Sequence, residues 1–180
     1  PGGGETMVLD VRPGTPDTGA LREAASELRK GGVVGFPTET FYGLGAAALD
    51  RGAVARIFEL KGRPRTKPIL VLVDSVAMVE AVAADVPDRA RALMDLHWPG
   101  PLTLVLRARP AVSEELTAGT GTVGVRLSAH PVARGLVRAL GEPVTAPSAN
   151  PSGLAPPTTA AEVLARFGGY ADRSFFRPRR

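Results

Sequence analysis

Apolar residues recur in this chain at two spacings, one typical of amphipathic helices and one typical of short strands. Leu21, Ala25 and Leu28 lie three to four positions apart, so they mark one face of a helix that Gly31 and Gly32 end. The same reasoning predicts helices over residues 18–30, 50–60 (with Asp50 as its N-cap), 131–140 and 159–167, and further helices that begin near Ser75 and Pro87.

Unbroken apolar runs alternate with these helices. The five residues Ile69–Val73 are all apolar, which is typical of a strand covered on both faces. Other runs predict strands over 33–36, 102–106, 122–127 and 144–146. Because strands and helices are mixed along the chain, we expect a single α/β domain with an open, twisted, mixed sheet and flanking helices.

Length and composition indicate how many domains to expect and where in the cell the protein works. With 180 residues we expect an irregular N-terminal segment over 1–17, one domain over 18–170 and a basic C-terminal tail over 171–180, disordered or docked. The absence of cysteine excludes disulfides and thiol catalysis. There is no signal peptide pattern and no apolar run that could span a bilayer, so we expect a cytoplasmic protein without membrane contact.

Positive charge is concentrated in one short segment. The net charge is +4, and four cations fall within Lys61–Lys67, beside two prolines that stiffen the loop. Such a one-signed loop indicates a site for a polyanion, because Arg and Lys side chains match phosphate oxygens. A solvated charge cluster, in a chain made arginine-rich by a high-GC genome, is the alternative.

Two further loops that follow predicted strands carry small polar groups. Pro37–Gly45 offers hydroxyls and glycines, and Ala146–Gly153 offers hydroxyls and an amide. Neither is a Walker A loop or a dinucleotide fingerprint. Arg126 lies in a strand-like run, where a cation needs a partner: an anionic ligand group or an internal carboxylate such as Glu39. These groups suit the orientation of charged ligands rather than covalent catalysis.

Two residues with chemically versatile side chains are given structural interpretations. Trp98 precedes a rigid turn and is expected to be a packing anchor, and His130 precedes a helix start and is expected to be structural.

Five segments in this order resemble the Sua5/YrdC/YwlC family of threonylcarbamoyl-AMP synthases over about residues 18–170. They are Pro37–Gly45, Lys61–Pro64, Trp98–Thr103, Gly124–Leu127 with His130 and Pro131, and Ala146–Asn150 with Ser152 and Gly153.

The resemblance implies a YrdC-like fold around a basic concave cavity and an enzyme, L-threonylcarbamoyladenylate synthase, which is a nucleotidyltransferase. Its substrates are L-threonine, bicarbonate or CO2, and ATP accompanied by Mg²⁺, and pyrophosphate is released. The adenylate feeds t6A37 modification of tRNA through downstream threonylcarbamoyl transferase proteins, and tRNA contact at the basic surface is a further expectation.

The resemblance also implies residue roles. Lys61 and Arg63 are catalytic positions. Thr40, Arg126 and Ala146 are threonine-binding, and Arg63, Lys67, Thr122, Ser148 and Asn150 are ATP-binding, with no metal site formed by the protein.

The chain departs from the family pattern in two places. Many relatives carry a histidine where this chain has Leu72, and they continue past Tyr170 into an apolar strand and a closing segment. Two alternative functions stay open. One is a non-catalytic RNA-binding module in tRNA or ribosome maturation, and the other is a carbamoyl-adenylate domain that uses carbamoyl phosphate.

Overall fold

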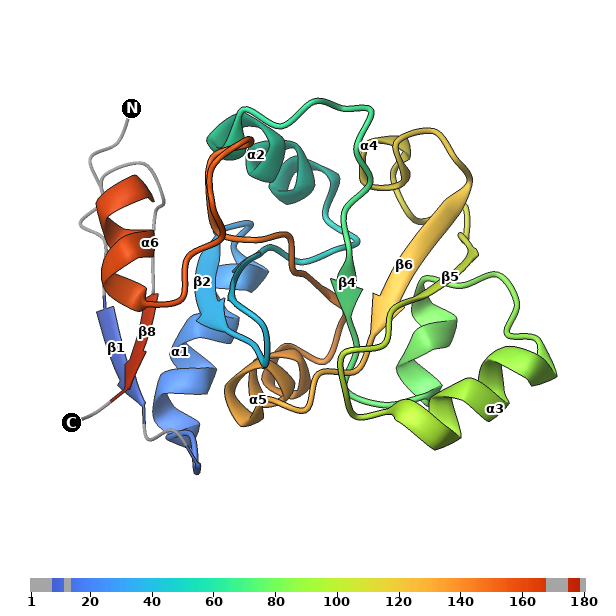
Figure 1. Ribbon diagram of the computed structural model, residues 1–180, viewed down its shortest axis with the longest axis horizontal. Helices are drawn as coiled ribbons and strands as arrows, with labels where there is room; N and C mark the ends of the chain where they lie inside the picture. The colour runs from blue at the N-terminus through green and yellow to red at the C-terminus, as the bar shows by residue number, and fades with distance from the viewer. Residues whose placement is uncertain (1–7, 12–13, 168–174, 179–180) are drawn as a thin grey trace.

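The computed structural model describes residues 8–11, 14–167 and 175–178 (Figure 1). The helices are α1 (Thr18–Arg29), α2 (Arg51–Lys61), α3 (Asp88–His97), α4 (Glu114–Thr117), α5 (Pro131–Leu140) and α6 (Ala160–Phe167), with the 3-10 helix η1 (Ala77–Ala81). The strands are β1 (Val8–Val11), β2 (Val34–Pro37), β3 (Tyr42–Gly45), β4 (Val71–Leu72), β5 (Leu104–Arg107), β6 (Thr122–Arg126), β7 (Val144–Thr145) and β8 (Phe175–Pro178).

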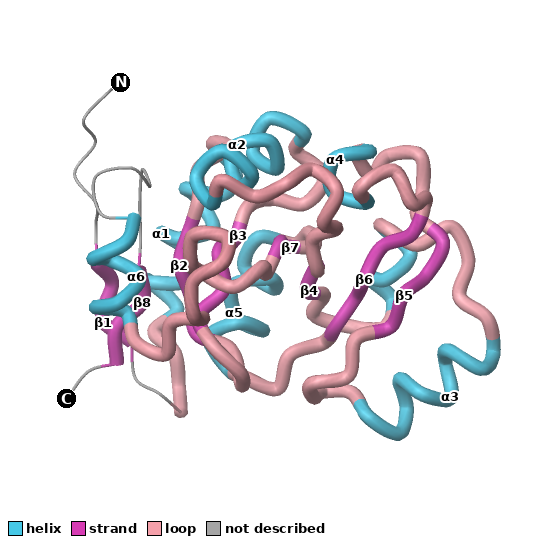
Figure 2. The backbone as a smooth tube through the Cα atoms, turned by 45° about the horizontal axis from the view of Figure 1, so that its top comes forward, coloured by secondary structure: helices cyan, strands magenta, loops and turns pink. Residues whose placement is uncertain are grey.

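The strands form two four-stranded sheets, in the orders β1-β8-β2-β3 and β5-β6-β4-β7. In the first sheet β8 is parallel to β1 and β2, and β3 is antiparallel to β2. In the second sheet β4 is parallel to β6, and β5 and β7 are antiparallel to their neighbours. Figure 2 shows β2, β3, β7, β4, β6 and β5 following one another across the molecule. The mixed sheet expected from the sequence is confirmed.

Hydrogen bonds from β3 to the chain around β7 join the two sheets. Leu44 donates its N–H to the carbonyl of Pro147 at 2.8 Å, and Ala149 donates to the carbonyl of Tyr42 at 2.8 Å. Gly45 belongs to this junction because a Cβ there would lie 2.7 Å from Phe36 and 2.9 Å from Val144. The two polar loops Pro37–Gly45 and Ala146–Gly153 are therefore held side by side.

Two apolar clusters cover the opposite faces of β4. Val71 and Val73 pack in the cluster that contains α2, whereas Leu72 packs in the cluster between α1 and α5. Successive side chains of a strand point to opposite faces, so the apolar run does mark a strand that is covered on both sides. Helices α1 and α5 approach closely, since a Cβ at Gly135 would lie 2.6 Å from Leu21.

The helices predicted from the pattern are confirmed, except that the one near Ser75 is the short 3-10 helix η1. Asp50 is confirmed as an N-cap, since its side chain accepts from the N–H of Ala53. Four of the five predicted strands are shorter than expected, and β4 keeps only two of its five residues, whereas the strand predicted over 33–36 keeps its length and is shifted by one residue as β2. Helix α4 was missed because four residues are too few to show a helical period, and β3 was missed because glycines alternate through it.

The terminal segments required correction. Residues 1–17 were expected to be irregular, but Val8–Val11 form β1. The basic tail was expected to lack regular structure, and with it the apolar strand that relatives have past Tyr170. Instead, Phe175–Pro178 form the strand β8. These two strands pair with each other, and partners so distant in sequence leave no local signal. The rest of the predicted tail lies outside the described residues. Within the described part, no helix is long and apolar enough to cross a membrane.

Candidate functional site

Lys61 is the last residue of α2, and the helix ends there because Gly62 adopts the left-handed conformation at φ 57°. The lysine side chain turns inward and is only 3% exposed. Its Nζ donates to the carbonyl of Asn150 at 2.6 Å and to the carbonyl of Ser148. Burial, and the nearby positive charge of Arg63, lower the pKa of Lys61 to about 8. This contact ties the basic loop to the loop after β7.

The other three cations of the basic loop differ in their surroundings. Arg63 is half-buried and donates to the carbonyls of Lys67 at 3.3 Å and Pro68 at 2.8 Å, so it braces the loop, and burial lowers its pKa. Arg65 is exposed and pairs with Glu115 of α4. Lys67 is exposed. Only Lys61 is withdrawn from water.

The turn between β2 and β3 is organised by Thr38. Its Oγ1 donates to the carbonyl of Phe41 at 2.7 Å and accepts the N–H groups of Thr40 and Phe41. The Thr38 and Thr40 hydroxyls lie 3.0 Å apart, and Thr40 is exposed. The turn therefore presents Thr40 next to Glu39.

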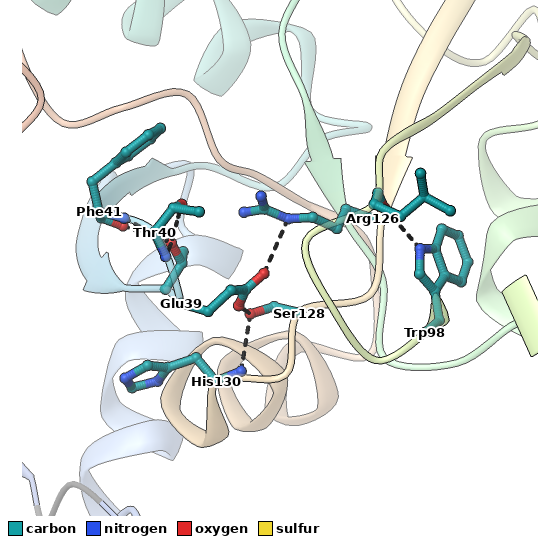
Figure 3. A network of polar contacts seen from close by, with 9 residues as sticks. Glu39, Thr40, Phe41, Trp98, Arg126, Ser128 and His130 are labelled. Carbon is teal, nitrogen blue, oxygen red and sulfur yellow. Dashed lines mark hydrogen bonds and ion pairs between the residues drawn. The ribbon is translucent and has the colours of Figure 1, made fainter. Parts of the chain in front are cut away.

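Arg126 ends β6 and is 6% exposed. Its Nε lies 3.4 Å from Oε1 of Glu39, so an internal carboxylate pairs with this nitrogen. The Ser128 hydroxyl donates to the other oxygen of Glu39, and Ser128 Oγ accepts the N–H of His130 at 3.1 Å (Figure 3). In Figure 3 the terminal nitrogens of Arg126 point toward the turn that carries Thr40.

The loop after β7 contacts both of its neighbours. Ala146 donates its N–H to the carbonyl of Leu70 at 2.8 Å and lies against Gly43 of β3. The amide of Asn150 donates to the carbonyls of Pro151 at 2.9 Å and Leu154 at 2.8 Å, while its Oδ1 is buried and has no hydrogen-bond partner. An unsatisfied buried oxygen is costly unless a ligand or water supplies a donor.

Thr122 lies apart from Arg126, at the other end of β6. Its hydroxyl is 2.9 Å from that of Thr120. Four residue steps along a strand separate Thr122 from Arg126 by roughly 13 Å. The structure thus joins Lys61, Ser148 and Asn150 directly and keeps Thr122 and Arg126 at opposite ends of one strand.

The structural interpretations of Trp98 and His130 are confirmed. The indole of Trp98 packs against the core and donates to the carbonyl of Leu102 at 2.8 Å. His130 caps α5 by accepting the N–H of Val132 at its Nδ1, and burial lowers its pKa although the Glu39 carboxylate opposes the shift. Sequence reasoning missed Ser128, because a single serine between a strand and a helix gives no signal.

Three cavities, of about 580, 600 and 480 Å³, lie beside α1 and α5, beside α4, and between α2 and α6. Neither Lys61 nor Arg126 lines any of them. The basic concave cavity that the resemblance implies stays a prediction.

Comparison with known proteins identifies the family. The family model of Sua5, YciO and YrdC, described as "Telomere recombination", matches residues 26–176. The chain belongs to this family. Its resemblance to the Sua5/YrdC/YwlC group is thereby confirmed.

Curated members of the Sua5/YciO/YrdC family resemble most of this chain. A threonylcarbamoyl-AMP synthase of Pyrococcus abyssi is 44% identical over 164 residues, which are 91% of this chain and 48% of the relative. One of Bacillus subtilis is 46% identical over 144 residues, which are 79% of this chain and 42% of the relative. One of Halorhodospira halophila is 39% identical over 152 residues, which are 84% of this chain and 80% of the relative. The chain spans about half the length of the first two relatives.

Solved structures of the Sua5/YciO/YrdC family share the fold. Pyrococcus abyssi Sua5 complexed with L-threonine matches with a TM-score of 0.91 and 43% identity, over 94% of this chain and 50% of that one. Escherichia coli YciO matches with a TM-score of 0.85 and 26% identity, over 94% of this chain and 83% of that one. The YrdC-like fold expected from the sequence is confirmed.

Proposed function

We propose that this chain forms L-threonylcarbamoyl-adenylate from L-threonine, bicarbonate or CO2, and ATP, with release of pyrophosphate. The observation that carries the proposal is the separation of two buried cations. Arg126 directs its terminal nitrogens toward the turn of Thr40, and Lys61 is anchored to the Ser148 and Asn150 carbonyls. The guanidinium of Arg126 suits an amino-acid carboxylate, and the ammonium of Lys61 suits phosphates.

The reaction needs orientation and charge stabilisation rather than an enzyme nucleophile. The threonine amine adds to CO2 and loses a proton, which gives a carbamate. A carbamate oxygen then attacks the α-phosphorus of ATP, the bond to the β-phosphate oxygen breaks, and pyrophosphate leaves. Binding both substrates in one orientation and stabilising the developing negative charge supply the acceleration.

On the amino-acid side, Arg126 would bind the threonine carboxylate through its two terminal nitrogens. Thr40 and Ala146 would border the rest of the threonine. A solved relative supports this half of the proposal, since the similar Pyrococcus abyssi Sua5 was solved in complex with L-threonine.

On the nucleotide side, Lys61, Arg63 and Lys67 would bind the triphosphate, with Lys61 and Arg63 stabilising the charge that develops. Ser148 and Asn150 would border the nucleotide, and the unpartnered Oδ1 of Asn150 supports a ligand donor there. Thr122 would contact its far end, since a span of roughly 13 Å along β6 suits an amino acid joined to a nucleotide.

Magnesium would arrive as part of the MgATP substrate. The described residues contain no group of three His, Asp or Glu side chains that could hold a metal ion. Mg²⁺ is commonly bound through substrate phosphates and water, so the proposal needs no such group. The adenylate would then feed t6A37 formation by a downstream threonylcarbamoyl transferase, with tRNA contacting the basic surface.

The test is incubation with ATP, L-threonine and bicarbonate, followed by mass spectrometry of the adenylate and an assay of pyrophosphate. We expect both products from the wild type and Lys30→Ala, and strongly reduced amounts from Lys61→Ala and Arg126→Ala. Folded protein that makes no adenylate contradicts the proposal. Adenylate from carbamoyl phosphate instead of threonine, or salt-sensitive RNA binding without turnover, would favour the corresponding alternative.

A further inference from the structure

Glu39 contacts Arg126 at an unusual place on the guanidinium. One carboxylate oxygen forms an ion pair 3.4 Å from Nε, although the buried Nε–H makes no hydrogen bond, and no hydrogen bond joins the two terminal nitrogens to another described residue. The second carboxylate oxygen accepts from the Ser128 hydroxyl instead of forming a second contact with the arginine. Glu39 therefore occupies one edge of Arg126 and leaves the other edge available.

The carboxylate of Glu39 is held in place from several sides. Ser128 binds it, and the N–H of His130, at the start of α5, fixes the Ser128 oxygen at 3.1 Å. The turn bonded to Thr38 fixes the backbone next to Glu39. The side chains of Arg126 and Glu39 are only 8% and 19% exposed, so solvent screens their attraction less than it would at the surface.

The free edge of Arg126 has the geometry for a second carboxylate. A guanidinium can bind one carboxylate end-on through its two terminal nitrogens while Nε contacts another group. In Figure 3 the terminal nitrogens face the turn that carries Thr40.

We propose that Glu39 is a positioning residue that holds Arg126 through Nε so that its terminal nitrogens receive the carboxylate of the amino-acid substrate. The inference rests on the proposed function, in which Arg126 binds that carboxylate. A different role, in which Glu39 occupies the arginine and the substrate must displace it, predicts an effect of opposite sign. The contact at Nε and the anchoring by Ser128 favour positioning.

Calorimetric titration with L-threonine and, separately, with ATP distinguishes the two roles. We expect Glu39→Gln to raise the threonine Kd about tenfold, because a charge-assisted contact is lost, and to leave the ATP Kd within about twofold. Ser128→Ala should raise the threonine Kd by a smaller factor. The double variant should fall short of the product of the single effects, because both side chains act through one contact.

The matched control is Glu142→Gln, which removes a carboxylate from an exposed loop and should change neither Kd. A threonine Kd that is unchanged or lower in Glu39→Gln overturns the proposal. If thermal unfolding shows that Glu39→Gln does not fold, the threonine Kd of Ser128→Ala is measured instead, because this variant deletes only one hydroxyl. An unchanged or lower Kd in Ser128→Ala then overturns the proposal.

A second readout separates this inference from the proposed function. If the wild type binds no threonine, the proposed function fails, but the Nε–H of Arg126 can still be observed by nitrogen-15 NMR, as the signal lost in Arg126→Lys. We expect the chemical shift of this signal to change in Glu39→Gln, because the carboxylate 3.4 Å away loses its charge, and to stay unchanged in Glu142→Gln. An unchanged shift in Glu39→Gln would show that Glu39 does not hold Arg126.

Discussion

Lys61 and Arg126 are both almost excluded from water, yet the protein holds them in opposite ways. Lys61 donates to two main-chain carbonyls, which orient its ammonium group but carry no net charge. Arg126 faces the carboxylate of Glu39, which compensates its charge. Under the proposed function, the cation with neutral partners binds the polyanion, and the cation beside Glu39 receives a single further carboxylate.

The largest expected effect comes from removing the uncompensated charge. Lys61→Met should lower kcat about a hundredfold or more, because a preorganised cation near the developing charge is lost. Steady-state pyrophosphate release measures this, and Lys30→Met, at an exposed lysine paired with Glu27, is the control. A tenfold or smaller loss in Lys61→Met would remove Lys61 from the catalytic role.

The second effect tests the two terminal nitrogens of the Arg126 guanidinium. Arg126→Lys keeps the charge beside Glu39 but loses the planar pair of terminal nitrogens, so the KM for threonine should rise roughly 10- to 100-fold. The KM for ATP should change little. Arg134→Lys, on α5, is the matched control for the substitution itself. Equal changes in both KM values would indicate that Arg126 does not act on the amino-acid side alone.

The third effect follows from the lowered pKa of Lys61. A polyanion favours the charged ammonium, so ATP binding should raise this pKa again and take up a fraction of a proton near pH 8.5, and almost none at pH 7. ATP affinity should correspondingly fall as pH rises through about 8. Calorimetry in buffers of different ionisation enthalpy measures the uptake. Proton uptake that persists in Lys61→Met would have to come from another group.

The smallest effect concerns Arg65, which lies in the same loop but is exposed and paired with Glu115. Arg65→Ala should lower the free energy of unfolding by less than about 1 kcal/mol, because exposed ion pairs contribute little, and pyrophosphate release should stay within about twofold. Urea unfolding measures the first, with Glu115→Gln as the control for the pair. A loss of turnover similar to that of Lys61→Met would mean that loop charge, rather than the buried ammonium, carries the function.

Much of the candidate site could be identified from the sequence, because it lies in short segments of unusual composition. The basic loop follows an amphipathic helix with a clear glycine end, and the polar loops follow apolar runs, so their positions could be predicted locally. Glu39 was recognised only as one candidate partner of Arg126. Ser128 was not recognised, because its role depends on a carboxylate 89 residues away.

The sequence by itself determined the long helices, the caps, the apolar strand that is covered on both faces, and the family. These follow from periodicity and from residues close together in the chain. Only the tertiary structure decided that β1 and β8 pair, that Lys61 donates to two carbonyls, and that Glu39 forms an ion pair with Arg126. Each of these depends on atoms brought together from distant segments, and local propensity does not encode such geometry.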